Sequence, residues 1–402
     1  MKTCDVVIIG AGISGLSLAH YCYRAGLDTV VLEKAGRAGG CLHSHQFTGD
    51  ADGFWLELGA HTCYSSYGEL IAVIEEAGLR NRLVPRARHP FRLLVEGRLR
   101  SIPSMLDIPG LVFSLPRILT AKKAGETMES YYSRILGKNN FAKVFGPVFD
   151  AIISQDARDF PADSLFKKRS KRKDVLKDFT LDQGLQTITD TLAAGQWVTL
   201  LTGQDVKPVE YRGGRFITAT DGEVFESRFL AVAAPPAAAS KLLKVSFPEL
   251  SDHLARLRSG SVETVGVALP KDAVKIPRVA GIIGVGDRFF SAVTRDVVEH
   301  ETRRGFAFHF RPGLLNRTEK VRRIAEVLGV EYGMITDIVQ KDDNAVPSLT
   351  LGHGLWVREA DRLVAGTPLM LTGNYYSGVS IEDCVERSVS EFVRIQGGGG
   401  PA

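Results

Sequence analysis

The sequence predicts an α/β fold in which two domains are interleaved along the chain. Three observations support this prediction. Residues 6–32 carry a strand, helix, strand pattern of the kind that builds a parallel sheet. A second strand and helix pattern follows near the other end, over residues 368–395. Between them, strand-like and helix-like segments alternate without a fixed order, which is typical of an α+β domain.

The N-terminal pattern is a complete βαβ unit. Val6 to Ile9 is a short apolar run, Leu16 to Ala25 has the spacing of a helix, and Thr29 to Leu32 is a second apolar run. The turn between the first strand and the helix reads Gly10-Ala11-Gly12-Ile13-Ser14-Gly15, and the second strand ends in Glu33. This arrangement predicts a Rossmann-like domain that binds a dinucleotide, rather than a glycine-rich turn in a nucleotide-free fold.

Each residue of this motif has a physical role in such a site. Gly10 permits a tight turn, Gly12 lets a pyrophosphate approach the positive end of the helix, and Gly15 allows the helix to pack closely on the strand. Glu33 is placed to accept hydrogen bonds from the adenosine ribose. The backbone of Ala11, Ile13 and Ser14 is expected to line the same site.

The segment after Glu33 identifies the dinucleotide. It reads Lys34-Ala-Gly-Arg37-Ala-Gly39-Gly40 and resembles the Arg-x-Gly-Gly segment of the flavin amine oxidase superfamily. The resemblance implies that FAD is the cofactor, that Lys34 and Arg37 lie near its ribose and pyrophosphate, and that Gly39 and Gly40 admit its flavin end. Val206 is implied to contact the adenine through its backbone.

A second segment resembles the part of this superfamily that lies beneath the isoalloxazine. It reads Leu56-Glu-Leu-Gly59-Ala60-His61-Thr62, with Ala60 in place of the usual proline. Near the C-terminus, Gly373-Asn374 and Gly378-Val379-Ser380 open a helix that runs from Ile381 to about Ile395. A helix start presents free N–H groups, and the resemblance implies that they meet the N1/C2 edge of the flavin. Four residues of the first segment and three of the second are therefore expected cofactor contacts: Gly59, Ala60, His61, Thr62, Gly373, Val379 and Ser380.

The two domains are expected to exchange the chain several times. The FAD-binding domain is predicted to comprise residues 1–85, 180–245 and 361–397, and the α+β substrate domain residues 86–179 and 246–360. Residues 398–402 are predicted to form a disordered tail.

Smaller matches favour one branch of the superfamily. The segment from Phe179 to Gly184-Leu-Gln186, together with Asn374 and Cys384, resembles protoporphyrinogen oxidases more than amine oxidases. The resemblance implies hydride transfer from protoporphyrinogen IX to flavin N5, late in haem synthesis, with oxygen or another acceptor reoxidising the flavin. Another superfamily oxidase, such as an amine oxidase or polyprenoid desaturase, and a non-catalytic flavoprotein are the alternatives.

Few residues point to the substrate itself. A tetrapyrrole carries two propionates, and the resemblance places Arg92 near the position of a substrate-binding arginine. His309 is interpreted as a hydrogen-bonded strand residue. No catalytic acid or base and no metal site is predicted.

Composition excludes several classes of partner. With 50 Lys and Arg against 46 Asp and Glu, the formal charge of +4 does not indicate nucleic acid. Five scattered cysteines suggest neither disulfides nor zinc, so a cytoplasmic protein is expected. The apolar segment Ile102–Leu119 is either a wall of the core or a helix that faces the inner side of the membrane or lines a substrate channel. The basic run Lys167–Lys173 is either a solvated loop or a site for anionic lipid, and a homodimer is left open.

Overall fold

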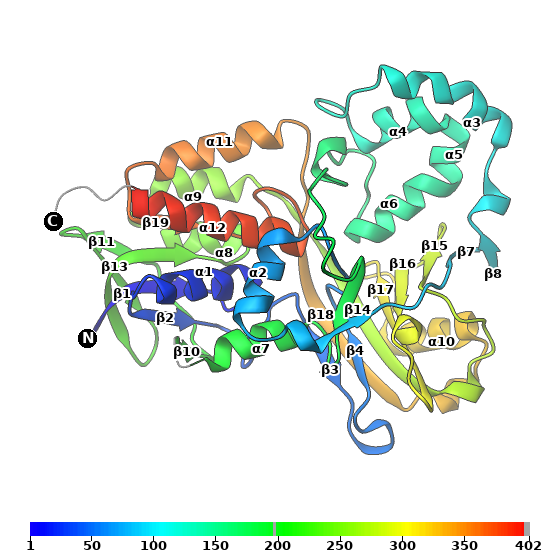
Figure 1. Cartoon of the computed structure of the whole chain (residues 1–402), viewed down its shortest axis with the longest axis horizontal. Coiled ribbons are helices and arrows are strands. Elements are labelled where there is room, and N and C mark those ends of the chain that lie inside the picture. The colour runs from blue at the N-terminus through cyan, green and yellow to red at the C-terminus, as the bar shows by residue number, and fades with distance from the viewer. Residues whose placement is uncertain (196–197, 398–402) are drawn as a thin grey trace.

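The computed structural model describes residues 1–195 and 198–397, and its mixture of helices and strands confirms the predicted α/β class (Figure 1). The expected tail at 398–402 lies outside the described residues. The sequence also predicts a strand over Trp197 to Leu201, and its first residue lies outside them too. Two large sheets lie in two parts of the molecule, and the chain passes between these parts more than once.

The first sheet contains the N-terminal βαβ unit. Its strands follow the order β10-β2-β1-β13-β12-β11, and β19 also pairs with β13. Val6 and Ile8 pack into a cluster on one face, whereas Val7 and Ile9 pack into the cluster on the other. The central strand is therefore buried on both faces, which explains its uninterrupted apolar run. The strand bounds are β1 Lys2–Ile9, β2 Thr29–Leu32, β10 Thr199–Leu201, β11 Glu210–Arg212, β12 Arg215–Ala219, β13 Val224–Val232 and β19 Leu369–Leu371.

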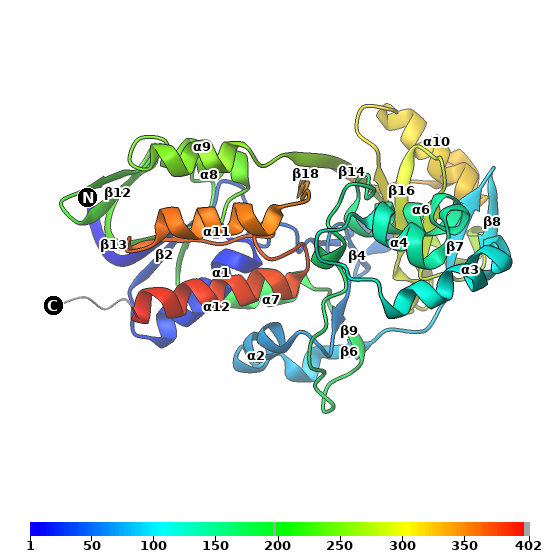
Figure 2. The same ribbon diagram turned by 90° about the horizontal axis from the view of Figure 1, so that it is seen from above.

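Helices cover both faces of this sheet (Figure 2). One face carries α1 (Ile13–Arg24), α2 (Gly68–Glu76), α7 (Gln186–Ala194) and α12 (Ile381–Gly397). The other carries α8 (Pro236–Leu243), α9 (Pro248–Ala255) and α11 (His353–Val364). The boundaries expected at 245 and 361 need correction, because α9 and α11 pack on the first sheet although most of their residues were expected in the substrate domain.

The second sheet follows the order β18-β14-β17-β16-β15-β7-β8. Its neighbours are antiparallel except for β15 and β7, which run parallel. Helix α10 (Arg317–Leu328) packs on one face through Val321, Ile324 and Leu328. The strand bounds are β7 Phe91–Val95, β8 Arg98–Ser101, β14 Ser259–Pro270, β15 Gly281–Gly284, β16 Phe289–Thr294, β17 Arg303–Phe310 and β18 Asp337–Pro347.

A group of helices lies beside the second sheet (Figure 1). It contains α3 (Ile108–Ser114), α4 (Met128–Leu136), α5 (Lys138–Asn140) and α6 (Gly146–Ile153). The apolar segment 102–119 is not one helix here, because its prolines divide it into α3 and two short 3₁₀ turns. Among the described residues, no helix is long and apolar enough to cross a membrane. Short strands join the two parts: β3 Ser44–Gln46, β4 Trp55–Glu57, β5 Cys63–Tyr64, β6 Leu83–Pro85 and β9 Asp178–Leu181.

Candidate active site

The glycine-rich turn presents bare backbone at the start of α1. The helix begins after Gly12, and no side chain caps its first N–H groups. A Cβ atom built on Gly12 would meet only the Cα atom of Gly40, at 4.0 Å, so the space before the helix is open. By contrast, a Cβ atom on Gly15 would lie 1.9 Å from the carbonyl oxygen of Gly10. Free donors, a positive helix end and open space fit a pyrophosphate group.

The structure gathers the residues expected at the adenosine end. The Glu33 carboxylate accepts hydrogen bonds from the N–H groups of Ala11, at 2.7 Å, and Ala35, at 2.8 Å. The backbone N–H group of Gln204 donates to the carbonyl of Glu33 at 2.8 Å, and Val206 lies two residues further along the chain. Lys34 forms an exposed ion pair with Asp205 instead of reaching the turn.

Arg37 holds the loop that faces the glycine-rich turn. Its guanidinium donates to the carbonyls of Ala38 and Gly40 at 2.8 and 3.0 Å, and burial lowers its pKa. The N–H group of Gly39 donates to the carbonyl of Ala11 at 2.8 Å. The arginine therefore shapes the Gly39-Gly40 loop.

The segment expected beneath the flavin, residues 59–62, contacts the residue that follows this loop. The N–H group of Ala60, which follows Gly59, donates to the carbonyl of Cys41 at 3.1 Å. The His61 Nδ1 atom lies 2.9 Å from the Thr62 hydroxyl. Burial, together with the charge of Arg86, lowers the pKa of His61 to about 3, so its imidazole is neutral at pH 7.

The C-terminal helix returns to the same place. The Ser388 hydroxyl, on α12, donates to the carbonyl of Ser14 at 2.8 Å. Gly373 follows β19, and Val379 and Ser380 immediately precede α12. The two ends of the chain thus meet at the candidate cofactor site.

One face of the second sheet carries polar side chains that the sequence analysis did not single out. Thr264, Ser291 and His309 are paired across adjacent strands and therefore share this face. The Asn344 amide donates to the Thr264 Oγ1 atom at 3.1 Å, and the Thr264 hydroxyl forms a hydrogen bond with His309 Nδ1 at 3.0 Å. Burial lowers the pKa of His309 to about 4. The imidazole is therefore neutral at pH 7.

Lys341 brings this face to the Gly39-Gly40 loop. It is paired with Thr264 across β18 and β14, and its Nζ atom lies 3.4 Å from the carbonyl of Gly40. Burial lowers the pKa of Lys341, and the charge of Arg37 lowers it further. Polar Asn344 within a strand was the signal available in the sequence, but the strand itself was not predicted.

Arg92 does not share this face, and its contact with a substrate stays a prediction. It is paired with Ile282, which packs in the cluster beneath α10. Leu93 and Ile283 pack in a different cluster, and their face is the one that carries His309. Because successive strand residues point to opposite faces, the Arg92 side chain lies on the face of the sheet that α10 covers.

The Gly-Leu-Gln segment packs against the paired strands β3 and β4. The Glu57 carboxylate is 5% exposed and accepts hydrogen bonds from the Ser44 hydroxyl, at 2.8 Å, and from the Leu185 N–H group, at 2.7 Å. A Cβ atom on Gly184 would lie 2.3 Å from Ser44 Oγ, so glycine is required there. The Gln186 N–H group also donates to Ser44 Oγ. These contacts explain the motif by packing.

The basic run is not a free solvated loop. Arg169 forms ion pairs with Asp383 and Glu386 on α12, and Arg172 pairs with Glu75 on α2. The run therefore joins the segment after α6 to the helices of the first sheet.

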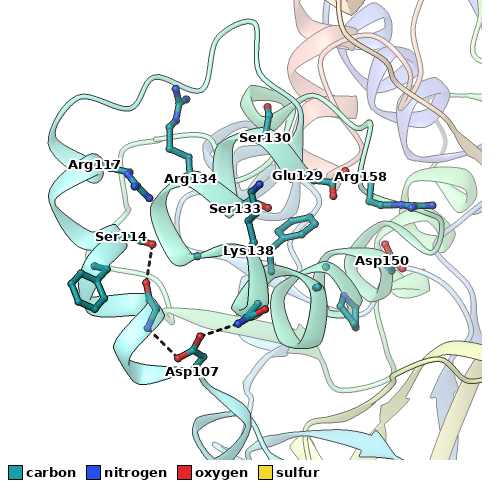
Figure 3. A pocket seen from close by; sticks show the side chains of 18 of the residues that line it. Asp107, Ser114, Arg117, Glu129, Ser130, Ser133, Arg134, Lys138, Asp150 and Arg158 are labelled. Carbon is teal, nitrogen blue, oxygen red and sulfur yellow. Dashed lines mark hydrogen bonds between the residues drawn. The ribbon is translucent and has the colours of Figure 1, made fainter.

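A hollow of about 1080 Å³ lies among α3, α4, α5 and α6 (Figure 3), and its lining residues come from positions 107–158 and not from the glycine-rich turn. Its charges are of both signs, and several are already paired: Arg134 with Glu126, and Arg158 with Asp156. We assign it no part in the candidate active site.

Comparison with known proteins places this geometry in a family. The model of the flavin-containing amine oxidoreductases matches residues 13–312. Bovine protoporphyrinogen oxidase is 25% identical over 98% of both chains. Among solved structures, a protein from Exiguobacterium sp. 255-15 that is provisionally named as a protoporphyrinogen oxidase has a TM-score of 0.79 at 19% identity, over 98% of both chains. Putrescine oxidase has a TM-score of 0.73 at 17% identity, over 98% of this chain and 99% of that one. The chain therefore belongs to the flavin-containing amine oxidoreductase family and is an FAD-dependent oxidoreductase.

Proposed function

We propose that this protein oxidises protoporphyrinogen IX to protoporphyrin IX in haem synthesis. The observation that carries the proposal is the 25% identity to bovine protoporphyrinogen oxidase over 98% of both chains. That likeness includes the segments that form the second sheet and the helices beside it. Putrescine oxidase shares the fold at lower identity, so the fold alone does not select the substrate.

The residues near the glycine-rich turn fit FAD, and we propose that those gathered from Glu33 to Ser380 hold it. When bound, FAD supplies a hydride acceptor, and oxygen or another acceptor reoxidises it. His61 and His309 have lowered pKa values, so neither is a strong base at pH 7. Hydride removal from a carbon beside an electron-rich ring depends on positioning and exclusion of water more than on a base.

Lys341 replaces Arg92 as the cation that we propose for a substrate carboxylate. Its strand position puts it on the face of Thr264 and His309, next to the Gly40 loop. A charged hydrogen bond from Lys341 to a propionate would contribute roughly 1.5–3 kcal/mol. The neutral His309 imidazole lies on the same face.

The test is reduction of the bound flavin. Under anaerobic conditions, protoporphyrinogen IX is expected to bleach the flavin, and with oxygen or a supplied acceptor the mixture should develop porphyrin fluorescence. Lys341→Met is expected to raise the KM for protoporphyrinogen about tenfold or more, which corresponds to roughly 1.4 kcal/mol or more. Arg92→Met is the matched control, and its KM should stay at the wild-type value.

The same experiment separates the alternatives. Bleaching by an amine or a polyprenoid, with none by protoporphyrinogen, would identify another oxidase of the family. A flavin that none of these compounds reduces would indicate a non-catalytic flavoprotein.

We further propose that α3 and the turn after it contact a lipid bilayer. Six apolar side chains in this segment are exposed, and Phe113 and Leu119 are 80% and 90% exposed. Such a surface binds membranes by inserting apolar side chains at the interface. The exposed members are Ile108, Val112, Phe113, Leu115, Ile118 and Leu119.

Replacing Phe113 and Leu119 by serine should lower co-sedimentation with phosphatidylglycerol and phosphatidylcholine vesicles at least tenfold. Burying each side chain contributes roughly 1.5–3 kcal/mol, so the loss of both should weaken membrane binding by more than tenfold. Val245→Ser removes an apolar side chain that is 63% exposed elsewhere and serves as the control. Equal sedimentation of both variants would contradict the proposed contact.

A further inference from the structure

We propose that Lys167 and Arg169 raise the reduction potential of the bound flavin by neutralising Asp383 at the start of α12. The inference rests on the placement of FAD proposed above, with the flavin edge at this helix start. This function of the basic run is separate from the oxidation of substrate. Both cations come from the loop between α6 and β9, whereas Asp383 belongs to the C-terminal helix.

The Asp383 carboxylate is packed beneath the turn that opens α12. Its side chain is 4% exposed, and its Oδ2 atom accepts hydrogen bonds from the N–H group and the hydroxyl of Ser380, at 3.0 and 2.5 Å. The space beside Gly378 is filled by the same atom, because a Cβ atom there would lie 2.6 Å from it. The negative charge of Asp383 is therefore held next to Ser380, which is expected to contact the flavin.

Two cations meet the other carboxylate oxygen. The Nζ atom of Lys167 lies 2.6 Å from Asp383 Oδ1, and a guanidinium nitrogen of Arg169 lies 2.7 Å from it. Lys167 also donates to the carbonyl of Ser377, which belongs to the same turn. Arg169 is shared with Glu386, one turn further along the helix. Lys167 is thus bound both to the carboxylate and to the backbone of the turn.

The sign of the effect follows from electrostatics. Reduction of the flavin places negative charge on its N1/C2 edge, and the start of a helix stabilises negative charge there. An unpaired Asp383 would oppose this stabilisation, because its own negative charge lies in a poorly solvated place. Pairing with Lys167 and Arg169 neutralises Asp383 and so removes most of its unfavourable effect on the reduced flavin. The neighbouring Glu382 carboxylate is used elsewhere, since it accepts hydrogen bonds from the N–H groups of Glu69 and Leu70.

The experiment measures the midpoint potential of the FAD-bound protein by equilibration with a reference dye. Lys167→Met is expected to shift the reduction equilibrium about tenfold against reduced flavin, which lowers the two-electron potential by about 30 mV. Asp383→Asn should raise the potential, and the double variant should return close to the wild-type value. Lys167→Arg, which restores the charge, should also return to it. Lys168→Met is the matched control, because Lys168 is exposed in the same loop.

A purely structural role for the loop would lower thermal stability without moving the potential. The proposal is overturned if Lys167→Met has the potential of Lys168→Met. If Lys167→Met does not fold, Arg169→Gln applies the same test, since it removes the second cation from Asp383. The measurement uses no substrate, so its outcome is independent of whether protoporphyrinogen is the reductant.

Discussion

Replacing Gly15 by alanine is expected to reduce FAD affinity at least 100-fold, equivalent to roughly 2.7 kcal/mol or more. The new Cβ atom would lie 1.9 Å from the carbonyl oxygen of Gly10 and 3.3 Å from the side chain of Ile8. Backbone cannot yield as a flexible side chain does, so α1 must move away from β1. That movement opens the turn whose N–H groups would hold the pyrophosphate. Titration of the deflavinated protein with FAD, followed by fluorescence quenching, measures the loss.

The substitution should also lower the free energy of unfolding of the apoprotein by roughly 1–3 kcal/mol, as overpacking does in other cores. Gly222→Ala is the control, because a Cβ atom at Gly222 meets no atom within 4 Å and FAD affinity should not change. A Gly15→Ala protein that binds FAD like the wild type would show that α1 can shift without disturbing the site.

The N-terminal unit could be predicted because its signals are local. The two apolar runs became β1 and β2, although α1 begins at Ile13, three residues before the predicted start. Glu33 was placed correctly beside the turn because the length of a βαβ unit fixes the distance between the ends of its strands. The contact of Glu33 with ribose stays a prediction.

Long-range pairings could not be predicted from the sequence. Lys167 and Asp383 are 216 residues apart, and nothing local marks them as partners. The face of β7 on which Arg92 lies depends on which side of the sheet α10 covers, and a strand pattern alone does not reveal that. The Gly184-Leu-Gln186 segment was interpreted as a mark of the substrate, but its contacts are with Ser44 and Glu57. The segment is therefore weaker evidence for the substrate than its resemblance to protoporphyrinogen oxidases indicated.

Glu57 itself was passed over, because a single acidic residue between two leucines carries no sign that it will be buried. Burial raises the pKa of Glu57 to about 7, although the Leu185 N–H group and the Ser44 hydroxyl act in the opposite direction. In the unfolded chain the pKa is near its ordinary value of 4.5. The native protein therefore loses stability as the pH rises from about 4.5 to about 7, where Glu57 ionises, and the loss is constant above that range.

Glu57→Gln is expected to remove this loss. A glutamine resembles the protonated carboxyl in shape and can still accept a hydrogen bond from Leu185, so the variant should match the wild type near pH 5. At pH 8 its free energy of unfolding should exceed that of the wild type by about 2–3 kcal/mol, since each pKa unit corresponds to about 1.4 kcal/mol. Urea unfolding of both apoproteins across this pH range measures the difference. Subtracting the two curves cancels the opposite contributions of His61 and His309, whose lowered pKa values favour the native state as the pH rises.

The matched control is Glu301→Gln, because Glu301 is exposed on the second part of the molecule and should give a curve parallel to that of the wild type. Glu382, whose pKa burial also raises to about 7, should contribute a second loss of the same sign. The double variant Glu57→Gln, Glu382→Gln should therefore gain more stability at pH 8 than either single change. If Glu57→Gln is no more stable than the wild type at pH 8, Glu57 is ionised at little cost in the native protein. Its contacts with Ser44 and Leu185, together with Arg86 and Arg295 nearby, would then outweigh its burial.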